Sequence, residues 1–231
     1  MPEIINSNHC KACIYKGLLF GGLNDDELNL LNRNKKEMLF KKGEIISTEG
    51  QDIAAFLYLK QGLVKLYKQS PNNKDQIISI AKPRDFISLL SMFSLSTYKY
   101  SISALEDSVV CSLDMEALKE VIKNNGAFAI DIMKKMSKMY DDIIEKRFEI
   151  NKKHLRGRIA YILIFFSTHI YQQDEFELPI SRREIAELIE MTTENVIRIL
   201  SEFRKDKIIH IDGKRIKLLD PDRLESVCKL G

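Results

Sequence analysis

The stretch from Ile180 to Lys205 constrains this chain most strongly, because its pattern predicts two short helices joined by a tight bend. Ser181 followed by Glu184 forms a capping box, so the first helix begins there. Thr192 caps the second helix after a bend at residues 190–191. In the second helix, apolar residues at helical spacing predict one buried stripe: Val196, Ile199, Leu200 and Phe203.

The opposite face of the second helix carries groups that can read DNA bases. It presents Thr193, Glu194, Ile197, Arg198, Ser201 and Lys205. An arginine can donate two hydrogen bonds to O6 and N7 of a guanine, and a carboxylate can accept one from a cytosine amine. Two amphipathic helices with a short turn are also common in ordinary helical domains, so this pattern alone leaves that alternative open.

A β-hairpin with a basic tip is predicted directly after the second helix. Residues 208–211 and 214–218 have strand patterns around the two-residue turn Asp212-Gly213. From Arg198 to Lys217 the chain has seven Lys or Arg against three Asp or Glu, a local balance of +4, compared with +3 for the whole chain. A helix-turn-helix followed by such a hairpin is a winged helix. The concentrated positive charge favours double-stranded DNA as the partner.

Composition sets the class of protein. A chain of 231 residues with 45% hydrophobic and 30% charged residues is expected to form one or two globular domains. The longest apolar run, residues 159–166, is too short to span a membrane, and no secretory signal begins the chain, so we expect a cytoplasmic location and no membrane partner. We find no catalytic constellation or phosphate-binding glycine loop, and therefore predict that the protein is not an enzyme.

The first half of the chain has the period of β-strands. Short strand patterns separated by turn residues occupy residues 37–40, 44–47, 55–60, 63–68, 76–80, 100–104 and 109–113. Many short strands at even spacing predict a compact barrel or roll. The predicted fold class is therefore α+β: an N-terminal jelly-roll-like β-roll, a long helix and a C-terminal winged helix-turn-helix domain.

The long helix is expected to run from about residue 127 to 153, and we place the domain boundary between residues 1–150 and 151–231. Its apolar residues recur at spacings of three and four over several turns, which is typical of a coiled-coil dimer interface. The alternative is that this face packs on the roll of the same chain. The residues predicted at the dimer interface are Ile132, Met136, Met139, Tyr140 and Ile143.

The order of these elements, and three motifs within them, resembles the Crp/Fnr family of bacterial transcription regulators. The motifs are Phe40-Lys-Lys-Gly-Glu-Ile-Ile46, Leu57-Tyr-Leu-Lys-Gln-Gly-Leu-Val-Lys-Leu66 and Thr192-Thr-Glu-Asn-Val-Ile-Arg-Ile-Leu200. The resemblance implies a homodimer that binds a two-fold symmetric DNA operator, contacts RNA polymerase and responds to a signal sensed by the roll. A regulatory module acting through protein contacts is the alternative function.

The resemblance also assigns residues to the DNA contact. It places Glu194, Ile197 and Arg198 at the base-reading positions. It places phosphate-contacting residues at Ser181, Arg183, Thr192, Thr193, Lys214 and Arg215. Glu190 departs from the family pattern, because a glycine is usual in the bend.

The signal itself is not identified by the sequence. Family members that bind cyclic AMP have a Gly-Glu-Leu turn and an Arg-Ser pair, but this chain has Ser88-Leu89 in that turn and no arginine between Arg84 and Arg147. The resemblance therefore argues against cyclic AMP bound in the usual mode. An unidentified small molecule would meet Ser88, Leu89, Tyr98 and Lys99.

Cysteines raise a second hypothesis about the signal. Cys10, Cys13 and Cys111 resemble three of the four cysteines of oxygen-sensing family members, whereas Leu19 occupies the remaining position. Because an iron–sulfur cluster normally has four thiolate ligands, a standard cluster is not predicted. Two alternatives stay open: a metal or redox site, or a buried strand cysteine with two unrelated N-terminal ones.

Overall fold

The computed structural model describes residues 3–5, 13, 20–69, 75–89, 91, 93 and 96–230. The chain divides into two compact units, Met1–Gln69 with Ile78–Asp142 and Ser70–Ile77 with Ile143–Gly231. The division falls within one long helix, α4 (Gly126–Asn151), whereas the sequence placed the boundary near residue 150. None of the helices in the described ranges is long and apolar enough to cross a bilayer.

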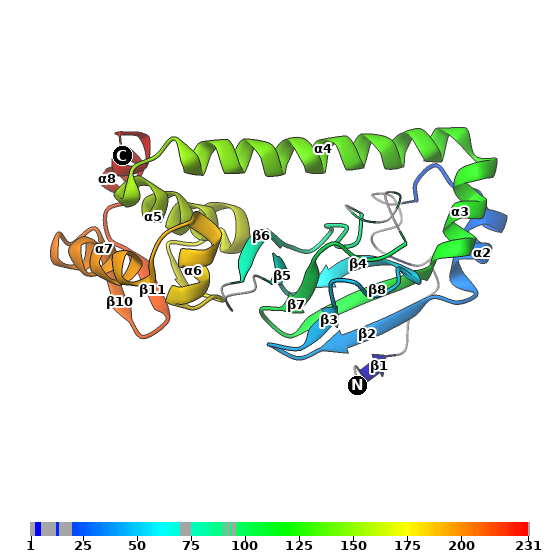
Figure 1. Cartoon of the computed structure of the whole chain (residues 1–231), viewed down its shortest axis with the longest axis horizontal. Helices are drawn as coiled ribbons and strands as arrows, with labels where there is room; N and C mark the ends of the chain where they lie inside the picture. Colours follow the sequence, from blue (N-terminus) through cyan, green and yellow to red (C-terminus); the bar gives the residue numbers. More distant parts are fainter. Residues whose placement is uncertain are drawn as a thin grey trace. The chain divides into compact units, whose positions relative to one another are not determined.

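The first unit is a roll of two sheets (Figure 1). In the described residues, one sheet has the order β1 (Glu3–Ile5), β2 (Lys36–Phe40), β8 (Ser108–Asp114) and β4 (Ala55–Gln61). The other has the order β3 (Ile45–Ser47), β7 (Ser101–Ala104), β5 (Val64–Lys68) and β6 (Gln76–Ala81). Central strands β8 and β7 pair antiparallel with both of their neighbours. The predicted roll is confirmed, and β1 is an additional strand.

Strand β4 shows how the roll forms its core. Successive side chains of a strand point to opposite faces. Phe56 and Tyr58 therefore lie in one apolar cluster, with the helices, while Leu57 and Leu59 lie in a second cluster with residues of both sheets. Burial on both faces explains why this strand has a continuous apolar run instead of an alternating pattern.

Two capped helices cover the first sheet. Asn24 caps α2 (Asp25–Asn32) in a capping box with Glu27, and Asp114 caps α3 (Met115–Asn124) by accepting a hydrogen bond from the N–H of Ala117 at 2.9 Å. Their buried residues join the cluster that contains Phe56 and Tyr58: Leu28, Leu31, Met115, Leu118 and Val121.

Gly62, between β4 and β5, is the turn residue that tolerates substitution least. Its φ is +84°, and a Cβ atom would lie 2.3 Å from Ser108 Oγ and 2.5 Å from the carbonyl oxygen of Asp107. Gly43 has a similar φ of +87°, but a Cβ atom there would meet nothing within 4 Å. We predict that Gly62→Ala lowers the free energy of unfolding by about 3 kcal/mol, because overpacking adds to left-handed strain. Gly43→Ala adds only strain and should lower the free energy of unfolding by about 1 kcal/mol. Urea titration of both variants and the wild type measures the difference.

The second unit consists mainly of helices and a small sheet. After α4, the chain forms α5 (Leu155–Ile164), a π-helix η2 (Phe165–Tyr171), β9 (Glu175–Glu177), α6 (Arg182–Ile189), α7 (Thr193–Lys205), β10 (Ile209–Asp212), β11 (Arg215–Leu218) and α8 (Pro221–Leu230). The sheet has the order β10-β11-β9. Completely buried residues from α5 to β11 form its interior: Leu163, Phe166, Ile189, Val196, Ile199, Phe203 and Ile216.

Three details of this unit differ from the sequence prediction. The hairpin turn is Gly213-Lys214, one residue later than predicted, because Asp212 pairs with Arg215 and Gly213 takes the positive φ of +58°. A third strand, β9, pairs with β11 and was not predicted. Helix α8 was also missed, although Asp220 followed by proline at the first helical position is a helix-start signal.

Candidate nucleic-acid interface

Helix α6, the first of the helix-turn-helix, begins at the predicted cap. The Oγ atom of Ser181 accepts a hydrogen bond from the N–H of Glu184 at 3.2 Å, and the Glu184 carboxylate accepts one from the N–H of Ser181 at 2.8 Å. These bonds satisfy donors that a helix start leaves unpaired. The buried face of α6 consists of Ile185, Ala186, Leu188 and Ile189.

Helix α7 presents the three predicted base-reading residues to solvent. Thr192 caps it by accepting a hydrogen bond from the N–H of Asn195 at 3.3 Å. Glu194, Ile197 and Arg198 are exposed, and Ile197 keeps 52% of its accessible surface. The residues buried on the opposite face are the four that were predicted: Val196, Ile199, Leu200 and Phe203. A rigidly anchored helix therefore carries a carboxylate, an apolar side chain and a guanidinium on one open face.

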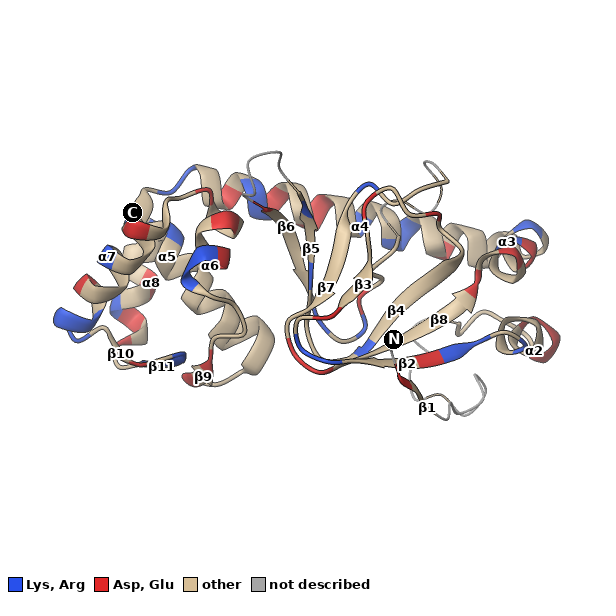
Figure 2. Ribbon diagram, turned by 60° about the horizontal axis from the view of Figure 1, so that its bottom comes forward, with Lys and Arg blue, Asp and Glu red and all other residues tan. Residues whose placement is uncertain are grey.

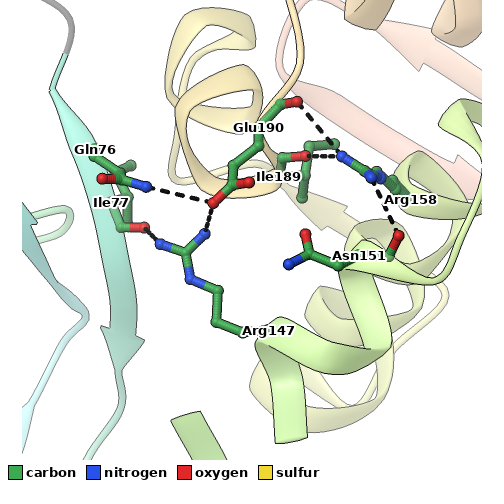
Figure 3. A network of polar contacts seen from close by, with 7 residues as sticks. All are labelled: Gln76, Ile77, Arg147, Asn151, Arg158, Ile189 and Glu190. Carbon is green, nitrogen blue, oxygen red and sulfur yellow. Dashed lines mark hydrogen bonds and ion pairs between the residues drawn. The ribbon is translucent and has the colours of Figure 1, made fainter. Parts of the chain in front are cut away.

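The bend between α6 and α7 depends on Glu190, which has left-handed backbone angles of φ 56° and ψ 53°. Its carboxylate accepts a hydrogen bond from the guanidinium of Arg147, near the end of α4, and a second from Gln76 Nε2 at 3.3 Å (Figure 3). The Arg147 guanidinium also donates to the carbonyl oxygen of Ile77 at 3.4 Å. Side-chain contacts thus hold a backbone conformation that ordinarily favours glycine.

We predict that Glu190→Gly changes the free energy of unfolding by less than about 1 kcal/mol. Glycine relieves left-handed strain of about 1 kcal/mol, while a partly exposed ion pair contributes about 0–1 kcal/mol. Glu190→Ala keeps the strain and loses the ion pair, so it should be less stable than both. Urea denaturation of the three proteins checks the order, and a loss above about 2 kcal/mol in the glycine variant would contradict it.

Arg158 holds the ends of two helices together, a role that the sequence did not indicate. Its guanidinium donates to the carbonyl oxygens of Ile189 at 3.1 Å and Asn151 at 3.3 Å (Figure 3). It also donates to the carbonyl oxygen of Lys153 at 3.0 Å. Ile189 ends α6 and Asn151 ends α4. Terminal carbonyls of a helix have no partner within the helix, so a cation that binds them stabilises both ends.

The wing, which is the hairpin of β10 and β11, carries its basic residues on the exposed side, as predicted. Lys214, Arg215 and Lys217 are all exposed. Figure 2 marks Lys and Arg positions in blue along the ribbon of this unit. However, the Glu175 carboxylate of β9 lies 3.5 Å from Lys217 Nζ and 3.9 Å from Arg215 Nη1. The local positive balance counted from residue 198 to 217 omitted this strand. The wing is therefore less positive than its sequence suggested.

A further contact connects α6 to the wing tip. Arg182 Nη2 donates a hydrogen bond to the carbonyl oxygen of Gly213 at 2.8 Å, and burial lowers the pKa of this guanidinium. Arg183, its neighbour, is exposed and pairs with Glu187 at 2.9 Å. Arg183 is thus available at the surface, whereas Arg182 has a structural role that the sequence did not indicate.

Three of the four residues predicted at an effector pocket are core residues of the roll. Ser88, Leu89 and Tyr98 are buried, and only Lys99 is exposed. Ser88 Oγ accepts a hydrogen bond from the N–H of Leu57 at 2.8 Å, and burial raises the pKa of Tyr98 to about 12. The structure therefore places Ser88, Leu89 and Tyr98 inside the roll and Lys99 at its surface.

One described cysteine, Cys111, lies beside a pair of opposite charges in the roll, Glu37 and Lys60. Cys111 is buried on β8, opposite Glu37 of β2, and Cys13 is half-buried; Cys10 lies outside the described residues. Burial lowers the pKa of Lys60, but its hydrogen bond to Glu37 at 2.8 Å and the charges of Glu37, Cys13 and Cys111 raise that pKa above its usual value overall. In the part of the chain that the structure describes, no three His, Cys, Asp or Glu side chains gather to hold a metal ion.

Helix α4 has two apolar stripes, and only one of them is exposed. Ile132 is buried in the roll, and Met136 and Met139 pack against the same cluster. Ile143 is half-buried. The exposed stripe, which we call the open α4 face, consists of Ile130, Met133, Tyr140, Ile144 and Phe148. Of the five residues predicted at a dimer interface, Tyr140 is the one that lies on this face.

Comparison with known proteins gives matches over most of the chain. Residues 37–125 match the family model of a cyclic nucleotide-binding domain, and residues 157–227 match that of a Crp-like helix-turn-helix domain. The chain is 27% identical over 225 residues to the transcriptional activator protein Anr of Pseudomonas protegens, covering 95% of this chain and 92% of that protein.

Two further proteins match this chain over most of its length. The fumarate and nitrate reduction regulatory protein of Vibrio cholerae is 25% identical over 218 residues, covering 92% of this chain and 87% of that protein. A solved structure from Eubacterium rectale, described as a regulator of the crp/fnr family, superposes with a TM-score of 0.79 at 22% identity. That match covers 91% of this chain and 97% of the other.

Proposed function

Because the chain belongs to the Crp/Fnr family of bacterial transcription regulators, and is a DNA-binding regulator and not an enzyme, we propose that it binds a two-fold symmetric DNA operator as a homodimer. The observation that carries this proposal is the exposed face of α7, where Glu194, Ile197 and Arg198 lie together while the opposite face is buried. The proposal includes a location in the bacterial cytoplasm, where a regulator of this kind would meet its operator.

Each of the three side chains has a definite role in this proposal. Arg198 donates two hydrogen bonds to O6 and N7 of a guanine, and Glu194 accepts one from a cytosine amine. Ile197 packs on the methyl group of a thymine, since it is exposed and has no polar group to offer. The operator half-site should therefore contain a guanine and a thymine at neighbouring positions.

Phosphate contacts position the protein without specifying the sequence. We assign them to the start of each helix and to the wing, where exposed or half-exposed polar groups lie: Ser181, Arg183, Thr192, Thr193, Lys214 and Arg215. The Glu175 carboxylate on β9 partly offsets the wing charge, so we expect wing contacts to contribute less than their number of cations suggests.

The open α4 face supports the homodimer. Its five apolar residues are exposed at spacings of three, four and seven along one helix, which is the spacing of a coiled-coil interface. A second copy of the same helix covers such a stripe symmetrically and places two copies of α7 about one helical turn of DNA apart. Since relatives are named transcriptional activators, we include RNA polymerase as a further partner.

The direct test is a titration of the purified protein with DNA from the region upstream of its own gene. We expect two protomers per operator and an affinity that falls by a factor of about 10³–10⁵ between 50 and 200 mM salt, as for other proteins with six to ten phosphate contacts. Binding to every fragment with equal affinity, or to none, would instead favour a regulatory module that acts through protein contacts.

Cys10, Cys13 and Cys111 resemble cysteines of oxygen-sensing family members, which makes thiol chemistry one candidate signal. The described thiols do not fit a standard four-thiolate iron–sulfur cluster, because Leu19 occupies the position of one expected ligand. Protein purified without oxygen should be compared with a Cys10→Ser variant by visible absorption and metal analysis. An iron–thiolate band lost in the variant would support a metal site, while colourless protein that still binds DNA would direct the search to a small molecule.

A further inference from the structure

The carboxylate of Glu202 lies between two arginines on the solvent side of the second unit. Its Oε1 atom accepts a hydrogen bond from Arg198 Nη1, and its Oε2 atom accepts one from Arg156 Nη1, each at 2.5 Å. Arg198 and Glu202 are four residues apart on α7, whereas Arg156 comes from α5. The candidate base-reading arginine is therefore connected through one carboxylate to a different helix.

Arg156 is itself fixed by the core. Its Cζ atom lies 5.0 Å from the centre of the Phe203 ring, and Phe203 is completely buried. Its Nη2 atom donates a hydrogen bond to Asp206 at 3.1 Å. With a ring on one side and two carboxylates at its ends, the Arg156 guanidinium has little freedom, and it holds Glu202 in place.

The Arg198 side chain is held by two hydrogen bonds that leave other N–H donors of its guanidinium available. Nη1 donates to Glu202 and Nη2 donates to Asn195 Oδ1 at 3.3 Å, although the side chain is 55% exposed. A guanidinium has five N–H donors, so three remain, and a guanine needs two. The two contacts are therefore compatible with base reading. They also restrict the rotamers of Arg198 before DNA binds, so that less side-chain entropy is lost on binding.

We propose that Glu202, held by Arg156, is a positioning residue that directs Arg198 to its guanine and so sets the specificity of the protein for that base. The inference rests on the proposed function. If Glu202 and Arg198 formed only an ordinary surface ion pair, the expected result would differ. Removing a carboxylate near DNA would then reduce repulsion of the phosphates and tighten binding to every sequence equally.

The test uses the full-length protein and a 30-base-pair duplex from the footprinted region upstream of its own gene. A second duplex carries 7-deazaguanine, which lacks the N7 acceptor, at the guanine that the wild-type protein protects in each half-site. We expect Glu202→Ala to bind the natural duplex about tenfold more weakly than wild type does. On the modified duplex, the variant and the wild type should bind with nearly the same affinity. Glu202→Gln, which keeps an acceptor oxygen, should show a smaller loss.

Glu225→Gln is the matched control, because Glu225 pairs with Lys229 at 3.4 Å across one turn of α8 and has the same charge. It should bind both duplexes as wild type does, and melting temperatures will show whether each variant is folded. Equal changes on both duplexes, or no loss in Glu202→Ala, would overturn the inference while leaving the proposed function intact. Failure of the wild-type protein to select any duplex would instead overturn the proposed function.

Discussion

Arg198→Ala is expected to remove sequence-specific binding while leaving general DNA affinity almost intact. A bidentate arginine–guanine contact discriminates against the wrong base by about 1–3 kcal/mol. A two-fold symmetric complex contains this contact twice, so the variant should lose about 2–6 kcal/mol, or roughly 30-fold to 10⁴-fold in affinity for the operator. Affinity for unrelated DNA should change little, because phosphate contacts elsewhere supply it.

The measurement is a pair of salt titrations, one with operator and one with unrelated DNA. Lys229→Ala is the matched control, since it removes one exposed positive charge from α8 and not from the reading face of α7. If both variants weaken operator binding equally, Arg198 contributes only charge. If Arg198→Ala weakens operator and unrelated DNA by the same factor, α7 is not the reading helix.

Local signals in the sequence were sufficient where a structure depends on adjacent residues. The caps at Ser181 and Thr192 each bond to a group three residues away, so a short pattern determines them. The buried stripe of α7 follows from helical periodicity in the same way. These features predicted the orientation of Glu194, Ile197 and Arg198, and the structure presents all three to solvent.

The sequence was insufficient where long-range packing decides the outcome. Ser88 and Tyr98 have polar groups suited to a ligand, but the roll uses them in its interior. Strand β9 is only three residues long, and its pairing with β11 brings Glu175 to the wing from outside the counted segment. Glu202 likewise gains its role from Arg156 on another helix, a contact that no spacing within α7 indicates.

Helix α4 shows the same difficulty in its clearest form, because apolar residues lie on two of its faces. Periodicity identifies a stripe but cannot determine which stripe faces the chain's own core when both have suitable residues. Ile132 is buried in the roll, while Ile144 and Phe148 keep 65% and 70% of their surface exposed. The interface expected with a second copy therefore moves around the helix from the predicted residues to the open α4 face.

Ile144→Glu is accordingly expected to convert the dimer into monomers at micromolar concentration. Burying an isoleucine side chain contributes about 1.5–3 kcal/mol, and the symmetric interface contains the residue twice. Placing two carboxylates there adds a desolvation cost, so the dissociation constant should rise by at least about 10³-fold. Sedimentation velocity over a range of concentrations measures this change, and operator affinity should fall with it.

Ile45→Glu provides the matched control for this prediction. Ile45 is 56% exposed on β3 and is not part of α4, so the same substitution there should leave the dimer intact. A dimeric Ile144→Glu protein would show that the open α4 face is not the interface. A variant that is monomeric, folded and still able to contact a single half-site would separate the two tasks of the molecule. In that case α7 alone contacts the bases, and α4 holds two copies of α7 at the spacing of the operator half-sites.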